Sequence, residues 1–353
     1  MMRDLLSDVA GLTVGHHHVL NPEVTLSDEH HDGVGRATGC TVVMTDAPVT
    51  AAVDVRGGGP GTRETDLLDP SHAVQQIDAV LLTGGSAYGL AAADGVMRHL
   101  EEHRRGVRMG RDDRVVPIVP GAVIFDLPMG DWSVRPDAEF GRAAAAAASA
   151  DFALGCVGAG TGARAGLLKG GVGSASTRIE TGAAAGLVVS ALMVVNPVGS
   201  VFDPATGVLW SAASVPEVGL RAPSADDVRA AAELAPKDTS LNTTIGVVAT
   251  DAQLTESECR RVAVAAHDGL ARAIRPAHSP LDGDTIFAVA TGRAAARPAE
   301  VDMPMMMPHL AVLDGVCAAV APVVERAIAR AILAATAVAG VPAYRDVFPS
   351  SGA

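Results

Sequence analysis

Two apolar runs with a capped helix between them constrain the fold of this chain more than any other feature. Residues 243–250 (TTIGVVAT) and 283–291 (GDTIFAVAT) are largely apolar on both faces of an extended chain, which is typical of strands buried inside a sheet. Between them, Thr255 and Glu258 have the spacing of a capping box, which predicts a helix to about residue 274. Such strands need a layer of structure on each face, so we expect a layered fold.

The rest of the chain supplies strands and helices for these layers. Short apolar runs predict strands at 41–44, 51–55, 79–82, 115–119, 122–125 and 187–195. Helices are expected at 90–104, 139–150, 226–234 and 310–339, and a polar stretch with a proline at 235–242 indicates an exposed linker. Strands followed by helices that cover two faces favour an α+β layered sandwich, built as a single domain of residues 1–353.

Charge and composition exclude several classes of protein. The chain has 27 Lys and Arg against 40 Asp and Glu, a net charge of −13, whereas nucleic-acid binding requires clustered basic residues. A hydrophobic content of 48% is too high for a disordered chain. The longest uncharged apolar run, near 182–195, is shorter than the roughly 20 residues that a membrane-spanning helix needs. We therefore expect a globular protein with neither a nucleic-acid nor a membrane partner.

The first residues and the cysteines predict the compartment. The N-terminal sequence MMRDLLSD contains two aspartates and lacks the apolar segment of a secretory signal. The four cysteines are far apart in the sequence and form no C-x-x-C motif: Cys40, Cys156, Cys259 and Cys317. Reduced thiols in a cytoplasmic protein are the favoured interpretation.

Two motifs could suggest a metal or a cofactor, but neither has the required spacing. His16-His17-His18 and the nearby Glu29-His30-His31 offer imidazoles for zinc, yet no H-E-x-x-H pattern supports that alternative, and solvated or turn histidines are favoured. The sequence GTGARA at 160–165 fits a dinucleotide-binding pattern, but the glycines at 170–173 interrupt the helix that should follow. We expect no cofactor and no metal.

The junction between Asn242 and Thr243 is the most informative position for chemistry. A buried strand that begins with a hydroxyl residue, directly after an exposed linker, is what an N-terminal nucleophile requires. The Thr243 hydroxyl would attack the carbonyl of Asn242, and hydrolysis of the resulting ester would free the Thr243 α-amine. An α-amine titrates near 7.7–8.0 in model peptides, so it can act as a general base at neutral pH. The alternative is a strand that simply starts with threonine, a residue common in strands.

Five further segments, taken together and in order, resemble the self-processing L-aminopeptidase/D-esterase family. This family includes β-aminopeptidases and 6-aminohexanoate-oligomer (nylon-oligomer) endohydrolases. The segments are RGGGPGTRE at 56–64, GGSAYGL at 84–90, VNPVG at 195–199, NTTI at 242–245 and DGDT at 282–285. The resemblance extends from GLTVGH at 11–16 to the C-terminal helix. It implies a layered αββα sandwich of the N-terminal-nucleophile-like, ornithine-acetyltransferase-like type.

The resemblance also implies roles for individual residues. Asn242–Thr243 matches the self-cleavage site, which would divide the chain into residues 1–242 and 243–353, with Thr243 as the nucleophile. Tyr88 matches the family's tyrosine near the substrate amine, and Asn196 matches the asparagine whose amide lies at the oxyanion site. Lys169 matches, more loosely, an active-site lysine of the threonine-type members.

Asp282 and Asp284 match the acidic segment of the family. The serine-type members have a Ser-x-Glu pattern here, whereas the nylon-oligomer type has two aspartates, as in this chain. We expect both carboxylates to reach the site only if the segment bends at Gly283. We expect one to orient the Thr243 amine or hydroxyl and the other to fix Lys169 or a neighbour.

An aminopeptidase acting on small peptide or amide substrates is the favoured function. The alternatives are a 6-aminohexanoate-oligomer hydrolase, an acyl transferase that moves acetyl from N-acetylornithine to glutamate, and a non-enzymatic binding protein that retains the fold. The resemblance also implies a homo-oligomer of processed pairs, in keeping with the long, alanine-rich, apolar helix at 310–339.

Overall fold

Nine strands pair into one mixed sheet in the part of the chain that the computed structural model describes, which comprises residues 2–111, 114–234, 241–294, 307 and 309–352. Their order is β10-β11-β12-β13-β2-β4-β7-β3, and β1 also pairs with β2. The strands are β1 (Leu12–Leu20), β2 (Ala37–Val55), β3 (Thr62–Arg63), β4 (Gln76–Thr83), β7 (Gly121–Val123), β10 (Gly171–Arg178), β11 (Val188–Val195), β12 (Ile245–Thr250) and β13 (Thr285–Ala290). Two small ribbons accompany them: β5 (Val107–Arg108) with β6 (Val115–Val116), and β8 (Arg164–Ala165) with β9 (Leu168–Lys169).

The long strand β2 belongs to two layers. Its residues 37–45 pair with β1, and its last residues, 50–55, pair with β13. Between these two parts, the pairing with β4 shifts register between Met44 and Val49. Such irregularities bend a strand, and here the bend carries β2 from one layer of strands into the other. The sequence predicted separate strands at 41–44 and 51–55, and the structure joins them into one.

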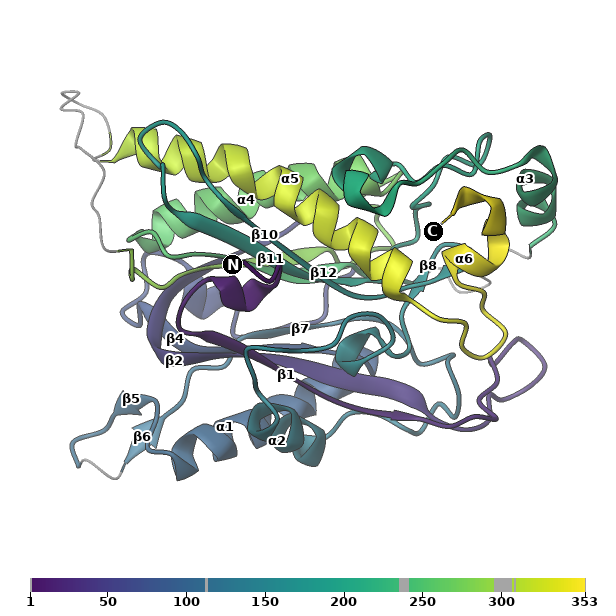
Figure 1. Ribbon diagram of the computed structural model, residues 1–353. Helices are drawn as coiled ribbons and strands as arrows, with labels where there is room; N and C mark the ends of the chain where they lie inside the picture. Colours follow the sequence, from purple (N-terminus) through teal and green to yellow (C-terminus); the bar gives the residue numbers. More distant parts are fainter. Residues whose placement is uncertain (1, 112–113, 235–240, 295–306, 308, 353) are drawn as a thin grey trace.

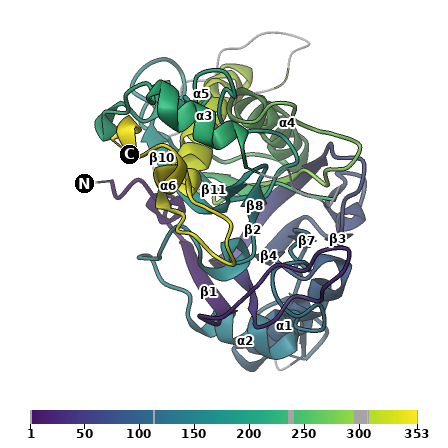
Figure 2. The ribbon, with the colours of Figure 1, turned by 90° about the vertical axis from the view of Figure 1, so that its right-hand side faces the viewer.

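Helices cover the two outer faces of this double layer. Both ribbon views show α4 (Glu256–Ala273) and α5 (Leu310–Ala334) over β10, β11 and β12, and α1 (Ala92–Glu102) and α2 (Ala138–Ala146) on the opposite side of the molecule (Figures 1 and 2). Two shorter helices, α3 (Ala225–Ala232) and α6 (Tyr344–Val347), lie near the C-terminus. The order of layers is helix, strand, strand, helix, which confirms the predicted α+β sandwich.

The central strands bury alternate residues in two different cores. In β13, Phe287 and Val289 face the core between the two strand layers, whereas Ile286 and Ala288 face α4 and α5. In β12, Ile245 and every second residue after it also face the core between the two strand layers. This period of two, with apolar residues on both faces, explains why these runs contain no clear polar face.

Small residues allow the helices to approach one another at backbone distance. A Cβ added to Gly269 of α4 would lie 2.2 Å from the Ala321 carbonyl oxygen of α5. On the other side of the molecule, a Cβ on Gly141 of α2 would lie 1.8 Å from the Ala92 carbonyl oxygen of α1. A chain with 3% aromatic residues therefore builds its helix layers through close backbone contact.

Several predicted boundaries move by a few residues. The capping box of Thr255 and Glu258 is present at the start of α4. The last helix ends at Ala334 and not near 339, because Ala335 is extended and the chain turns at Gly340 (φ +76°). Most of the predicted linker, residues 235–240, lies outside the described residues. The described helices include none with the length and hydropathy needed to cross a membrane.

The close contact between α4 and α5 predicts that replacing a glycine of α4 by alanine lowers the free energy of unfolding. An exposed helical Gly→Ala change stabilises a protein by about 1 kcal/mol. Gly269→Ala should instead lower the free energy of unfolding by about 1–3 kcal/mol, because the new methyl group meets a backbone carbonyl. Urea denaturation measures the change, and Asp268→Ala, at an exposed position of the same helix, should stay within about 0.5 kcal/mol. A stabilised Gly269→Ala variant would contradict this packing.

Candidate active site

The Asn242–Thr243 peptide lies where two parallel strands begin. Strands β12 and β13 are parallel neighbours, with Ile245 opposite Thr285, so the residues that precede them run side by side. Asn242 continues this pairing through an isolated bridge with Asp282. The pairing of these strands therefore brings the predicted cleavage site next to the predicted acidic segment, although 40 residues separate Thr244 from Asp284 in the chain.

Two donors bind the carbonyl oxygen of Asn242, the residue before Thr243. The Thr243 hydroxyl donates a hydrogen bond to the carbonyl oxygen of Asn242. The Gly283 amide donates to the same oxygen at 3.1 Å, and the Thr243 amide donates to the Asn196 carbonyl oxygen at 3.0 Å. Asn242 and Thr243 are only 2% and 4% exposed, so these hydrogen bonds lie away from bulk water.

Gly283 has no room for a side chain beside Thr243. A Cβ there would lie 2.8 Å from the Thr243 Oγ1 and 2.8 Å from the Gly59 carbonyl oxygen. A Cβ on Gly57 would similarly lie 2.2 Å from the Asp282 carbonyl oxygen. The glycine-rich segment at 56–61 thus packs directly on the acidic segment, which explains why both motifs consist of such small residues.

The two aspartates each accept a hydrogen bond from the backbone of a segment near Thr243. Asp282 is fully buried, and its Oδ1 accepts a hydrogen bond from the Val198 amide at 3.0 Å. Asp284 is 1% exposed, and its Oδ1 accepts from the Thr244 amide at 2.9 Å. Asp284 therefore contacts the residue after Thr243, and its partner there is a backbone amide.

Asn196 follows β11 and is fully buried. Its backbone carbonyl accepts from Thr243, and its side-chain Oδ1 accepts from the Arg164 amide at 2.8 Å. Its Nδ2 donates to the Phe125 carbonyl oxygen at 3.3 Å. An amide nitrogen has two hydrogens, so this bond leaves Nδ2 one further donor for a reacting carbonyl.

Lys169 is also fully buried and is connected to Asn196 through a single peptide group. Its Nζ donates to the carbonyl oxygens of Gly160, Ala163 and Gly170, at 2.9, 2.7 and 2.9 Å. The peptide between Ala163 and Arg164 therefore accepts from Lys169 at its oxygen and donates to Asn196 at its nitrogen. Burial lowers the pKa of Lys169, and nearby Cys156 and, to a smaller extent, Asp126 oppose this shift.

Asp126 is a buried residue of this region that the sequence did not single out. Its Oδ1 accepts from the Gly85 amide at 2.6 Å, and its Oδ2 accepts from the Thr38 hydroxyl at 2.7 Å. Burial raises the pKa of Asp126 to about 6. Because it fixes the glycine turn before the short helix Ser86–Ala91, it anchors the segment that carries Tyr88.

Tyr88 lies at the surface of this region, with 56% of the residue exposed. The guanidinium of Arg135 stacks on its ring at 3.7 Å. Within the described parts of the chain, no hydrogen bond joins Tyr88 to Thr243. The structure therefore brings together Asn242, Thr243, Asn196 and the two aspartates, connects Lys169 through a peptide group, and places Tyr88 nearer the solvent.

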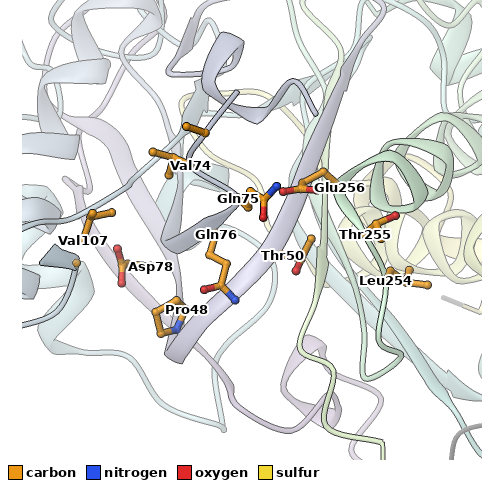
Figure 3. Close-up of a pocket in the computed structure, with 12 residues that line it drawn as sticks. Pro48, Thr50, Val74, Gln75, Gln76, Asp78, Val107, Leu254, Thr255 and Glu256 are labelled. Carbon is orange, nitrogen blue, oxygen red and sulfur yellow. The ribbon is translucent and has the colours of Figure 1, made fainter. Parts of the chain in front are cut away.

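A separate groove of about 600 Å³ opens at the other end of the strands (Figure 3). Its wall includes Thr50, which pairs with Ala290 at the end of β13, whereas the cleavage site adjoins Thr285 at the start of that strand. The buried carboxylate of Asp78 also lines the groove and lies 3.8 Å from Arg105, a charge of opposite sign. No cluster of three or more His, Cys, Asp or Glu suited to a metal occurs among the described residues.

Comparisons of sequence with known proteins identify the family of this chain. The model of "Peptidase family S58" matches residues 4–345. An "uncharacterized aminopeptidase" of Mycobacterium tuberculosis (strain ATCC 25618 / H37Rv) is 55% identical over 351 residues, which is 98% of each chain. The 6-aminohexanoate-oligomer endohydrolase of Kocuria sp. (strain KY2) is 33% identical over 291 residues, which cover 80% of this chain and 75% of that protein.

Solved structures share the fold. A Burkholderia sp. β-aminopeptidase matches with a TM-score of 0.70 at 22% identity, over 100% of this chain and 95% of that one. The L-aminopeptidase D-Ala-esterase/amidase of Ochrobactrum anthropi, described as a variant of the Ntn hydrolase fold, matches with a TM-score of 0.68 at 21% identity, over 94% and 86% of the two chains. The predicted family resemblance is thus confirmed, and the chain belongs to peptidase family S58.

Proposed function

We propose that this chain is a self-processing aminopeptidase that cuts its own Asn242–Thr243 bond and then uses Thr243 to hydrolyse small peptides or amides. The observation that carries the proposal is the hydrogen bond from the Thr243 hydroxyl to the carbonyl oxygen of Asn242, the group that Thr243 would attack. Membership of a peptidase family supports hydrolysis of an amide bond.

The first reaction is an N→O acyl shift. The Thr243 Oγ1 forms a bond to the Asn242 carbonyl carbon, and negative charge develops on the Asn242 oxygen, to which the Gly283 amide already donates. The C–N bond then breaks, and the hydroxyl proton passes to the Thr243 nitrogen. Water hydrolyses the ester, which restores the hydroxyl and leaves a carboxylate on Asn242 and a free amine on Thr243.

The second reaction repeats this chemistry on a substrate. The neutral Thr243 α-amine takes the hydroxyl proton while Oγ1 attacks the substrate carbonyl, giving an acyl-enzyme and a released amine. Water then attacks the acyl-enzyme and releases the acid. The Gly283 amide and the remaining Asn196 Nδ2 hydrogen supply donors for the oxyanion, each worth roughly 3–4 kcal/mol in other hydrolases.

Lys169, Tyr88 and the aspartates have supporting roles in this proposal. Lys169 polarises the Ala163–Arg164 peptide and so strengthens its donation to Asn196 Oδ1. Asp282 and Asp284 fix the backbone amides of Val198 and Thr244 on either side of the nucleophile. The exposed ring of Tyr88 is available to the amino end of a substrate.

The two products of cleavage would stay together. Strands β12 and β13, which belong to residues 243–353, lie between β11 and β2, which belong to residues 1–242. Helix α5 packs on β10 and β11, and α4 packs on β2 and β13, so the apolar face of α5 is already covered within the chain. We therefore infer one hydrolase domain made of two processed chains, while its assembly into homo-oligomers stays a prediction from the family resemblance.

Replacement of Thr243 tests the nucleophile. Thr243→Ala should remain a full-length chain, whereas the wild type should yield fragments that end at Asn242 and begin at Thr243. Thr243→Ser keeps the hydroxyl and should still be cleaved at the same bond. Intact-mass analysis with N-terminal sequencing measures all three, and a new N-terminus at any other residue would contradict the assignment.

Replacement of Asp284 tests the support of Thr244. Asp284→Asn should slow chain cleavage about 10- to 100-fold, because hydrogen bonds to a charged group contribute about 1.5–3 kcal/mol and an amide accepts through one oxygen only. The time course of fragment formation measures this rate. Asp268→Asn, on the exposed side of α4, is the control, and unchanged cleavage in Asp284→Asn would leave Asp284 with a structural role alone.

A comparison of substrates tests the aminopeptidase assignment. Processed wild type should release p-nitroaniline from amino-acid p-nitroanilides, and Thr243→Ala should not. The 33% identity with the 6-aminohexanoate-oligomer endohydrolase makes 6-aminohexanoate oligomers the second substrate to examine. Turnover of the oligomers without turnover of the anilides would favour that alternative, and acetyl transfer from N-acetylornithine to glutamate would favour the acyl transferase.

A further inference from the structure

A histidine outside the predicted site lies directly against Asp284. The Nδ1 of His278 lies 2.8 Å from Asp284 Oδ2, and the His278 backbone amide donates to the same oxygen at 3.1 Å. A carboxylate only accepts hydrogen bonds, so Nδ1 carries the hydrogen in this contact. The two oxygens of Asp284 thus have different partners: Oδ2 accepts from His278, and Oδ1 accepts from the Thr244 amide.

The backbone of His278 is shaped for this contact. Its φ of +56° lies in the left-handed region, which glycine and asparagine adopt more readily than other residues. In this conformation the amide and the ring of one residue both reach the same carboxylate oxygen. The side chain is 21% exposed and Asp284 is 1% exposed, so the imidazole covers the buried carboxylate on its solvent side.

The other titratable side chains near His278 bind one another and not Asp284. His267 of α4 packs edge-on against His278 with ring centroids 4.8 Å apart, and its Nε2 donates to the Asp54 carbonyl oxygen at 3.1 Å. The Asp54 carboxylate lies 2.7 Å from Arg56 and 2.9 Å from Arg260. Burial lowers the pKa of His267 to about 4, so this ring is neutral near pH 7. Within the described chain, the imidazole of His278 is the only side chain that hydrogen-bonds to the Asp284 carboxylate.

The contact reaches the nucleophile through one peptide group. Asp284 Oδ1 holds the Thr244 amide, and the Thr285 amide holds the Thr244 carbonyl oxygen at 3.2 Å. The Thr244 nitrogen belongs to the peptide bond that leaves Thr243, so its position sets the direction of the Thr243 backbone and hydroxyl. Movement of the Asp284 carboxylate would therefore shift Oγ1 relative to the Asn242 carbonyl.

We propose that His278 is a positioning residue for Thr243, which acts by donating from Nδ1 to Asp284 and thereby fixes the Thr244 peptide. The inference rests on the proposed function, because it concerns the same nucleophile. His278 has no covalent part in the reaction. Loss of its side-chain donor should slow chain cleavage and lower kcat for an amino-acid p-nitroanilide, with a smaller change in KM.

Two substitutions separate the side-chain donor from the backbone conformation. Asparagine and glycine both accept the left-handed conformation, but only asparagine has a side-chain nitrogen near the position of Nδ1. His278→Asn should cleave within about 3-fold of the wild type, and His278→Gly should be at least 10-fold slower. Added imidazole should partly restore the rate of His278→Gly. His103→Gly, at the exposed end of α1, is the control and should match the wild type.

The thermal midpoints of the two His278 variants, each measured with Thr243→Ala so that the chain stays intact, show whether both fold. If His278→Gly does not fold, His278→Ala takes its place as the variant without a donor. A double-mutant cycle adds a second test, since His278→Gly should have little further effect in the Asp284→Asn background if it acts through Asp284.

Each outcome bears on one proposal or the other. Equal cleavage rates in the wild type, His278→Asn and His278→Gly would overturn the role of His278, as would a folded His278→Asn that is as slow as His278→Gly. Additive effects of His278→Gly and Asp284→Asn would also overturn it. If the wild type is never cut before Thr243, the proposed function fails first, and the p-nitroanilide assay with Thr243→Ala shows that result independently.

Discussion

The parallel pairing of β12 with β13 is the constraint on which the rest of the site depends. It sets Ile245 opposite Thr285, so the chain immediately before each strand must run beside the other. As a result, the Gly283 amide donates to the Asn242 carbonyl oxygen, and the Thr244 amide donates to the Asp284 carboxylate. Because both strands are buried on two faces, a slip of one residue would turn Phe287 out of the core between the strand layers, and the register is accordingly fixed.

Burial of a charged side chain near Asn196 has a cost that the structure offsets with hydrogen bonds. An ammonium without water is unfavourable by several kcal/mol, and Lys169 has three backbone carbonyls and the nearby charge of Asp126 in place of water. The three carbonyls all belong to residues 160–170, so these contacts fold this one segment back on Lys169, beside Asn196. The Ala163–Arg164 peptide, which stabilises the buried Lys169 through its oxygen, also helps to fix the Asn196 amide through its nitrogen.

The sequence predicts the layers well because they depend on periodicity and on capping. The runs before α4 and after it were recognisable as buried strands, and Thr255 with Glu258 marked the helix between them. Strand β12 begins at Ile245 and not at Thr243, because the Thr244 amide binds the Asp284 side chain in place of a neighbouring strand. The route from Lys169 to Asn196 could not be predicted, since its middle member is a backbone peptide. His278 gave only one signal, its nearness in sequence to Asp284.

The same contacts keep Thr243 buried. Thr243 is 4% exposed while Leu241, two residues earlier, is 46% exposed, so the chain passes from the surface into the core within two residues. In the proposed reaction, departure of Asn242 removes the group that fills the space beside Oγ1 and Gly283. A substrate carbonyl that enters this space would accept a hydrogen bond from the Gly283 amide, the same donor as in the proposed self-cleavage. One set of backbone contacts, fixed by the β12–β13 register, can therefore serve both reactions without a rearrangement of the sheet.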